Sequence, residues 1–252
     1  MTRARERTAL VTGAGSPTGI GCAVAEALGR AGYRVALTST TARIHDRARE
    51  LAAAGCVASG HVADLTEPDQ VARLVAEVGR VDVLVNNAGM AVLGAIDAQL
   101  PLQAMSLELW RTVLERNLTT AFLVTRACLP EMIAAGWGRI VNVSSTTGAV
   151  AGVACDSAYA AAKAAMLGMT RSLCLEVARQ GITVNAVAPG WIATGSQTDE
   201  ERRAGAASPL GRSGTAAEVA AAIAFLCSEG ASYVTGQLVV VDGGNSVIEN
   251  KA

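Results

Sequence analysis

Short apolar runs alternate with amphipathic segments along the whole chain. Runs of Ala, Val, Ile and Leu about four to eight residues long are typical of buried strands, and apolar residues three or four positions apart are typical of helices. The expected strands cover residues 8–12, 33–38, 57–62, 81–85, 138–144, 182–187 and 237–241. Helical patterns lie between them, over 22–31, from about 67, over 106–132 and 157–180, and after Thr215. Gly181 is the expected C-cap of the helix over 157–180, and Thr215 and Glu218 have the spacing of a capping box. The alternation predicts an α/β fold: one doubly wound parallel sheet (Rossmann) over residues 1–252, with helices on both faces.

Length and composition narrow the class of protein. The chain has 252 residues, of which 51% are hydrophobic and 17% charged, enough for one large domain. A net charge of -1 offers no basic surface for nucleic acid or anionic membrane. The charged residues 1–7 lead directly into the first strand, and there is no apolar run of about 20 residues, so we expect neither a signal peptide nor a membrane span.

The cysteines indicate neither a metal site nor a disulfide framework. Six are scattered along the chain without a C-x-x-C pair, and they do not pair with the two histidines. Free thiols are the usual state in a reducing compartment, so we expect a cytoplasmic protein.

A glycine-rich turn follows the first strand and opens the first helix. In this context glycines let the backbone approach a pyrophosphate at a helix N-terminus, which predicts a dinucleotide site. The candidate residues are Gly13, Gly15, Ser16, Gly19, Ile20 and Gly21.

The end of the second strand favours NADP over NAD. An NAD site usually places Asp or Glu about 20 residues beyond the glycine turn to hold the ribose 2′-OH, and residues 38–42 contain neither. Ser39, Thr40 and Arg43 could instead receive a 2′-phosphate. Arg43 could also simply be a solvated charge at the start of the next helix.

Polar and small residues stand at the ends of further strands, where open α/β sheets bind ligands. Asp64 and Leu65 follow the third strand, and Asn87, Ala88 and Gly89 follow the fourth. Asp64 is either a helix cap or an adenine contact.

Tyr159 and Lys163 are four residues apart in an Ala-rich helical segment, so their side chains leave the same face. A cation beside a phenol lowers its pKa from about 10 and makes it a general acid/base. A Tyr and a Lys at this spacing can also simply be polar residues on the exposed face of a helix. Among 21 basic residues, however, Lys occurs only at 163 and 251, which favours a functional reason for it.

Three further features belong to the expected site. Asn117, inside the helix over 106–132, is either a local hydrogen bonder or the cause of a helix distortion. Ser145 follows the strand over 138–144. Residues 193–214 are polar and small, as in a mobile substrate lid. An apolar pocket is indicated by Met90, Val92, Leu93, residues 150–155 and Trp191, each of which could equally be ordinary packing.

Together these residues resemble the short-chain dehydrogenases/reductases of ordinary length, in particular 3-oxoacyl-acyl-carrier-protein reductases and carbonyl reductases. The resemblance covers nearly the whole chain, through its order and spacing of motifs: residues 12–21, 86–89, Asn117, Ser145, Tyr159 with Lys163, Pro189 with Gly190, and residues 241–244.

The resemblance implies an NADP(H)-dependent oxidoreductase that interconverts a ketone and a secondary alcohol. Tyr159 would be the general acid/base, and Lys163 would lower its pKa and bind the nicotinamide ribose. Ser145 would hydrogen-bond the carbonyl oxygen, and Asn117 would hold a water that links Lys163 to solvent. Asp64 and Leu65 would flank the adenine. The rest of the cofactor site would be formed by Asn87, Ala88, Gly89, Tyr159, Lys163, Pro189, Gly190, Ile192 and Thr194. The family also implies a homotetramer or homodimer, built through the two long helices and the last strand.

The sequence departs from the family pattern in two places. Five residues separate Gly13 from Gly19, where three are usual. This resembles the divergent enoyl reductases, but those space Tyr and Lys more widely, so we expect an enlarged phosphate loop on a ketoreductase. Which of Gly15, Ser16 and Thr18 contacts phosphate stays open. The segment between Ser145 and Tyr159 is also about one residue longer than in the ketoreductases of fatty-acid synthesis, which makes Ser144 and Thr146 alternatives to Ser145.

Two other functions are compatible with the sequence. One is an NAD-linked alcohol, polyol or steroid dehydrogenase, and the other is a non-catalytic dinucleotide-sensing regulator, which would not need Ser145, Tyr159 and Lys163 together. The substrate could be a small ketone or an acyl thioester. An acyl carrier protein would require a basic docking patch, for which Arg126, Arg139 and Arg171 are candidates.

Overall fold

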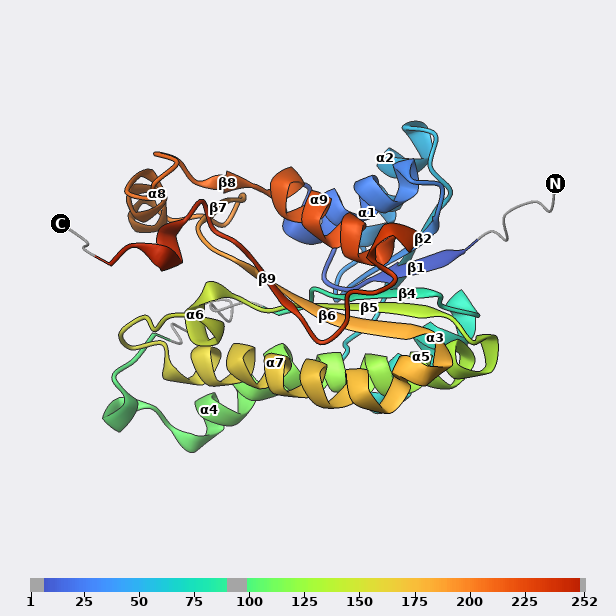
Figure 1. Ribbon diagram of the computed structural model, residues 1–252, viewed down its shortest axis with the longest axis horizontal. Coiled ribbons are helices and arrows are strands. Elements are labelled where there is room, and N and C mark those ends of the chain that lie inside the picture. The colour runs from blue at the N-terminus through green and yellow to red at the C-terminus, as the bar shows by residue number, and fades with distance from the viewer. Residues whose placement is uncertain (1–6, 90–98, 250–252) are drawn as a thin grey trace.

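A computed structural model describes residues 7–89 and 99–249, so the candidate pocket residues Met90, Val92 and Leu93 lie outside the described part. Seven parallel strands form one sheet in the order β3-β2-β1-β4-β5-β6-β9 (Figure 1). The strands are β1 (Thr8–Val11), β2 (Arg34–Ser39), β3 (Ala58–Val62), β4 (Val83–Asn86), β5 (Gly138–Val143), β6 (Ile182–Pro189) and β9 (Leu238–Val241). The predicted doubly wound sheet is confirmed.

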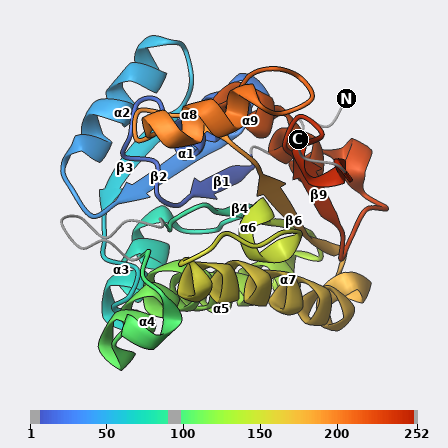
Figure 2. The same cartoon turned by 90° about the vertical axis from the view of Figure 1, so that its left-hand side faces the viewer.

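Helices cover both faces of the sheet (Figures 1 and 2). One layer consists of α1 (Ile20–Arg30), α2 (Arg43–Ala53) and α9 (Ala216–Cys227); the other consists of α3 (Pro68–Val78), α5 (Thr120–Ala135) and α7 (Ser157–Val177). Side chains alternate between the two faces along each strand. Ala9 and Val11 pack in the first core, whereas Leu10 packs in the second.

The sheet order places a topological switch point between β1 and β4. From β1 the chain winds outward through β2 to β3, and it then returns to β4 on the other side. Ligands of open α/β sheets bind at the carboxyl ends of the strands beside such a point. The glycine turn after β1 and the Asn-Asn-Ala-Gly turn after β4 meet there.

The helix expected over 106–132 is interrupted. It is divided into α4 (Leu107–Leu114), one π-helical turn (η2, Glu115–Thr119) and α5. Asn117 lies in this turn, and its Nδ2 donates to the carbonyl of Val113 at 3.0 Å. An amide side chain that bonds to the backbone competes with the regular helical hydrogen bonds, which explains the extra residue in the turn.

The expected lid region contains regular structure. It includes β7 (Ile192–Ala193) paired with β8 (Gly214–Thr215), and α8 (Asp199–Ala206) between them. Thr198 and Glu201 form a capping box at the start of α8. The capping box expected at Thr215 begins α9 and is confirmed. Whether this segment moves remains a prediction.

The other described elements are short. They are η1 (Leu102–Ala104), α6 (Thr146–Ala149), η3 (Ala178–Gln180), η4 (Glu229–Ala231) and η5 (Asn245–Val247).

The stretch Leu107–Ala135 is long and apolar enough to cross a membrane by length and composition alone. In the fold its side chains Val124, Cys128 and Met132 are buried against the sheet. One face of α5 therefore packs in the core of the domain, while Phe122 and Ile133 are exposed.

Candidate active site

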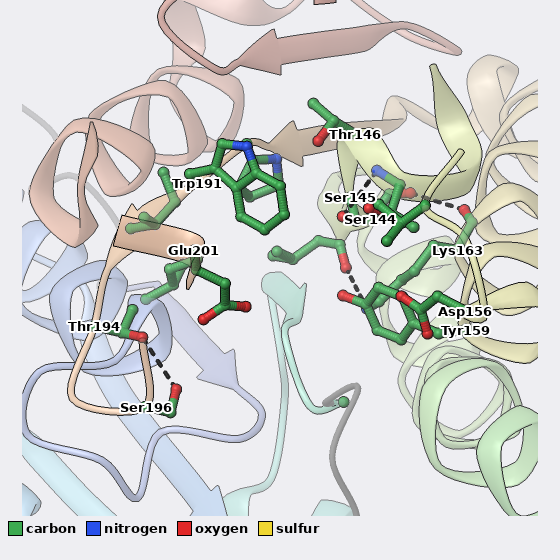
Figure 3. Close-up of a pocket in the computed structure, with 18 of the residues that line it drawn as sticks. Ser144, Ser145, Thr146, Asp156, Tyr159, Lys163, Trp191, Thr194, Ser196 and Glu201 are labelled. Carbon is green, nitrogen blue, oxygen red and sulfur yellow. Dashed lines mark hydrogen bonds between the residues drawn. The ribbon is translucent and has the colours of Figure 1, made fainter. Parts of the chain in front are cut away.

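A cleft of about 230 Å³ opens at the carboxyl ends of the central strands. Tyr159, Lys163 and Ser145 face one another on one side of it, and Trp191, Thr194 and Glu201 lie on the opposite side (Figure 3). Of the residues predicted from sequence, the cleft is lined by Ile20, Asn87, Gly89, Ser145, Tyr159, Lys163, Pro189, Gly190, Ile192 and Thr194. Segments from both halves of the sheet thus meet at one site.

Lys163 is buried on α7, with only 3% of its surface exposed. Its Nζ lies 5.5 Å from the centroid of the Tyr159 ring and donates to the carbonyl of Val143 at 2.9 Å. Burial lowers the pKa of Lys163 to about 8, because the ammonium has lost water.

The phenol of Tyr159 has the opposite shift. Burial raises the pKa of Tyr159 to about 12, although the residue keeps part of its surface open to the cleft. A hydrogen bond with Ser145 lowers this pKa, and the carboxylates of Asp156 and Glu201 raise it. The sequence led us to expect a lowered pKa for Tyr159, whereas the net shift in this structure is upward: the Lys163 ammonium lies over the ring and bonds to a backbone carbonyl, and it does not offset the burial of the phenol.

The serine pair at the end of β5 has two different roles. Ser144 is buried, and its hydroxyl donates to the backbone carbonyl of Lys163 at 2.7 Å, which ties β5 to α7. Ser145 caps α6, where its Oγ accepts from the amide of Thr147 at 3.1 Å. Ser145 is thus the hydroxyl that contacts Tyr159. Thr146 also lines the cleft.

Asn117 lies directly behind the cleft. Gly89 lies beside both Asn117 and Lys163, and its φ is +145°. A Cβ at this position would stand 2.5 Å from Oδ1 of Asn117 and 3.3 Å from Nζ of Lys163. Only glycine allows the chain to pass so close to both side chains. Asn117 is therefore a neighbour of Lys163 without lining the cleft itself.

The glycine turn packs tightly against the turn after β4. A Cβ on Gly13, where φ is +68°, would stand 2.7 Å from Cα of Ala88. Thr12, which sequence reasoning did not single out, accepts from the amides of Asn87 and Ala88 at 2.9 Å each. Asn87 in turn donates its Nδ2 to the carbonyls of Thr12 and Gly13. This rigid backbone cradle fits a pyrophosphate at the N-terminus of α1.

The enlarged loop is also connected to the lid. Thr18 Oγ1 accepts from the amide of Gly195 at 2.8 Å, and the amide of Gly19 donates to the carbonyl of Ser16 at 3.2 Å. Gly15 lies against Ser39, since a Cβ there would stand 3.0 Å from the Ser39 side chain. Ser16 and Thr18 are both exposed, and which of the three residues contacts phosphate stays a prediction.

The candidate 2′-phosphate residues lie at the end of β2, outside the lining of the cleft. Ser39 Oγ donates to the carbonyl of Thr41 at 2.9 Å, and Arg43 Nε donates to Oγ1 of Thr41 at 3.3 Å. Thr40 and Arg43 are exposed. These residues form a polar, cationic surface near the glycine turn.

Asp64 does not cap the next helix, which was one of the two roles expected for it. Its side chain closes a turn instead. Its Oδ1 accepts from the amide and the hydroxyl of Thr66 at 3.0 and 2.7 Å, which lowers the pKa of Asp64. The N-cap of α3 is Glu67. Leu65 is buried beside it.

Two acidic residues of the cleft were missed in the sequence. Asp156 precedes α7, and Glu201 comes from α8. The spacing of Thr198 and Glu201 matches the capping box recognised at Thr215, and this signal could have located α8. Nothing local indicates that the Glu201 carboxylate faces Tyr159. Among the described residues, no group of three or more His, Cys, Asp or Glu could hold a metal ion.

Comparison with known proteins places this cleft in a family. A family model described as Enoyl-(Acyl carrier protein) reductase matches residues 13–246. The chain is 43% identical to cis-4-hydroxycyclohexanecarboxylate dehydrogenase of Sinomonas cyclohexanicum, covering 96% of this chain and 98% of the relative. It is 40% identical to the 3-oxoacyl-[acyl-carrier-protein] reductase FabG of Vibrio cholerae, again covering 96% and 98%. The structure of a variant actinorhodin polyketide ketoreductase with NADPH superposes with a TM-score of 0.89, at 38% identity, covering 98% of this chain and 100% of that one.

The chain belongs to the short-chain dehydrogenase/reductase family, and it is an oxidoreductase that acts on CH–OH and carbonyl groups.

Proposed function

We propose that this protein is a cytoplasmic, NADP(H)-dependent reductase that converts ketones to secondary alcohols, and the reverse, with Tyr159 as the proton donor and acceptor. The observation that carries the proposal is that Tyr159, Ser145 and Lys163 line one cleft at the switch point of the sheet. A site that only sensed a dinucleotide would have no need of this set.

The proton chemistry follows from the environment of Tyr159. With a pKa of about 12 the phenol holds its proton near neutral pH, so it donates to the substrate oxygen as the carbonyl is reduced. Ser145, in hydrogen-bond contact with the phenol, supplies a second donor to that oxygen and stabilises its developing negative charge. In alcohol oxidation the phenolate accepts the proton.

Lys163 stabilises the phenolate state. Its ammonium lies 5.5 Å from the ring centroid in a buried site, where electrostatic interactions are stronger than in water. The charge therefore acts on the state that forms after proton transfer. Asn117, in contact with Gly89 beside the ammonium, orients this corner of the site.

The cofactor would lie along the carboxyl edge of the sheet. Ser16 and the turn residues Gly13–Gly21 would hold the pyrophosphate, Asn87–Gly89 and Lys163 the nicotinamide ribose, and Ile192 and Thr194 the carboxamide. When bound, a nicotinamide dinucleotide supplies the hydride; the protein supplies position and the proton.

NADP is the preferred cofactor in this proposal. Thr40 and Arg43 are exposed at the end of β2, and no acidic residue stands at 38–42 to hold a ribose 2′-OH. The related actinorhodin ketoreductase structure, which contains NADPH, supports the choice. The six cysteines are free, which agrees with a reducing cytoplasm.

The substrate in this proposal is a small ketone, because one of the three arginines considered for docking an acyl carrier protein is not available for it. Arg139 is buried, with 2% of its surface exposed, and donates to the carbonyls of Gly138 and Gly181. It therefore cannot form part of a basic docking patch with Arg126 and Arg171.

A panel of small ketones and 3-oxoacyl thioesters, with NADPH or NADH oxidation as the readout, tests the proposal. We expect at least one ketone to be reduced, with NADPH preferred. Arg43→Ala should raise the KM for NADPH about tenfold, the loss of affinity expected for one charged hydrogen bond. The KM for NADH should stay unchanged. Arg49→Ala, on the exposed side of the same helix, is the control. A preference for NADH would overturn the cofactor assignment, and no reduction of any ketone would overturn the function.

A further inference from the structure

Glu201 brings a carboxylate from the lid into the cleft. It stands in the first turn of α8, and in Figure 3 its side chain points into the space across from Tyr159. The capping box holds it there: Oε2 accepts from the amide of Thr198 at 2.8 Å, and the amide of Glu201 donates to Oγ1 of Thr198 at 3.2 Å. The position of the charge is therefore fixed by the helix start.

The charges around the substrate space are mostly negative. Asp156, 4% exposed, lines the same cleft from the start of α7. The basic side chain in the described lining is Lys163, whose ammonium is turned to the Val143 carbonyl. Both carboxylates act on the phenol of Tyr159, since each raises its pKa. A substrate oxygen that contacts Tyr159 therefore lies within reach of both negative charges.

We propose that Glu201 is a specificity-determining residue that makes this enzyme accept uncharged ketones and reject ketones that carry a carboxylate. The inference rests on the proposed function, because it assigns the substrate class of the same cleft. Two like charges about 8 Å apart near a protein surface repel enough to change affinity by a factor on the order of ten. The relative named for cis-4-hydroxycyclohexanecarboxylate takes, by that name, an anionic substrate, so the two proteins would differ in this respect.

The capping role alone would also explain a Glu at this position, and one substitution separates the two explanations. Glu201→Gln keeps a side chain that caps at this position but removes the charge. Glu200→Gln is the matched control, because it removes a charge from an exposed neighbour in the same helix turn. Equal melting temperatures of the two variants and the native protein would show that the cap is intact.

The test uses a pair of ketones with nearly the same shape, 4-oxocyclohexanecarboxylate and 4-oxocyclohexanecarboxamide. Binding is measured by calorimetry with NADP present, and turnover is followed as NADPH oxidation. We expect the native protein and Glu200→Gln to bind the amide about tenfold more tightly than the carboxylate, and Glu201→Gln to bind both within about threefold. The preference of the native protein should shrink at high salt.

The binding ratio decides the inference independently of turnover. An unchanged ratio in Glu201→Gln, or tighter binding of the carboxylate by the native protein, would overturn it, even if both ketones were reduced. A ratio that collapses in Glu201→Gln while neither ketone is reduced would support charge selection and would count against the proposed function.

Discussion

Lys163 carries a full charge into the protein interior. Its pKa is lowered to about 8 by burial, so the folded protein holds this proton less firmly than the unfolded chain does. The ammonium donates hydrogen bonds to the Val143 carbonyl at 2.9 Å and to the Met166 sulfur at 3.8 Å. Residues of this kind reduce stability and are retained for function.

Lys163→Met should therefore stabilise the fold while turnover is lost. At pH 7 we expect the free energy of unfolding to rise by about 2 kcal/mol. This is the destabilisation that corresponds to the lowered pKa of Lys163, minus the stabilisation lost with the hydrogen bond to the Val143 carbonyl. Between the folded pKa of about 8 and the ordinary lysine pKa of 10.5, the unfolded state binds more protons, so the native protein gains stability with rising pH. The advantage of the variant should shrink over this window. Urea unfolding at pH 7, 9 and 10.5 measures it, and a difference independent of pH would contradict the account.

The candidate site shows what single residues reveal in a sequence. Tyr159 and Lys163 were recognisable because helical spacing alone places them on one face, and Ser145 because it follows a buried strand. Thr12 and Glu201 were not recognisable, because only the fold brings Thr12 against Asn87 and places Glu201 across the cleft from Tyr159. The pKa of Tyr159 was mispredicted for the same reason: burial and the direction of the Lys163 ammonium are tertiary properties.

At the scale of elements, α6 and α7 are held together by a glycine. Gly148 adopts φ of +88°, and a Cβ there would stand 2.1 Å from the carbonyl oxygen of Ala160. The contact sets the distance between the turn that carries Ser145 and the helix that carries Tyr159. The catalytic geometry thus depends on the absence of a single methyl group.

Gly148→Ala should push α6 away from α7. We expect turnover to fall at least about tenfold, because small displacements of positioned groups are costly in catalysis, and the melting temperature to fall as well. Gly152→Ala in the same connection is the control, since nothing lies within 4 Å of its Cβ position. Equal activity of the two variants, measured as kcat/KM on one ketone, would refute this role for Gly148.

Elements were predictable where periodicity was strong and less so where side chains intervene. The seven strands and the Gly181 helix end, where φ is +72°, agree with the sequence pattern. The sequence did not decide whether Asn117 distorts its helix, because an Asn within a helix can form a local hydrogen bond with or without a distortion. The structure shows a π turn there. The regular structure within 193–214 was missed, because the composition of a polar segment hides an eight-residue helix that depends on its capping box.

At the scale of the whole molecule, two exposed apolar surfaces are available for assembly. Phe122, Ile133 and Leu175 are exposed on α5 and α7, and Phe225, Tyr233 and Val240 are exposed on or near α9 and the edge strand β9. A tetramer with closed symmetry needs two different self-complementary surfaces. These two surfaces are the candidates for the interfaces of the homotetramer that the family resemblance implies, which stays a prediction.

Sedimentation velocity should therefore show a tetramer. Leu175→Glu, which places a charge at the most exposed large hydrophobic side chain of α7, should give dimers without loss of secondary structure. Val57→Glu, at the start of β3 and away from both surfaces, should remain tetrameric. A monomeric native protein would contradict this assembly, and so would a tetramer that survives Leu175→Glu.

The central claim is that a phenol in the cleft moves the proton. Tyr159→Phe removes that hydroxyl alone, and Tyr233→Phe removes one from a side chain that does not line the cleft. Measured side by side as NADPH-dependent ketone reduction, Tyr159→Phe should lose about a thousandfold in kcat/KM while its Kd for NADPH stays within about twofold, and Tyr233→Phe should match the native enzyme. Undiminished reduction by Tyr159→Phe would contradict the mechanism.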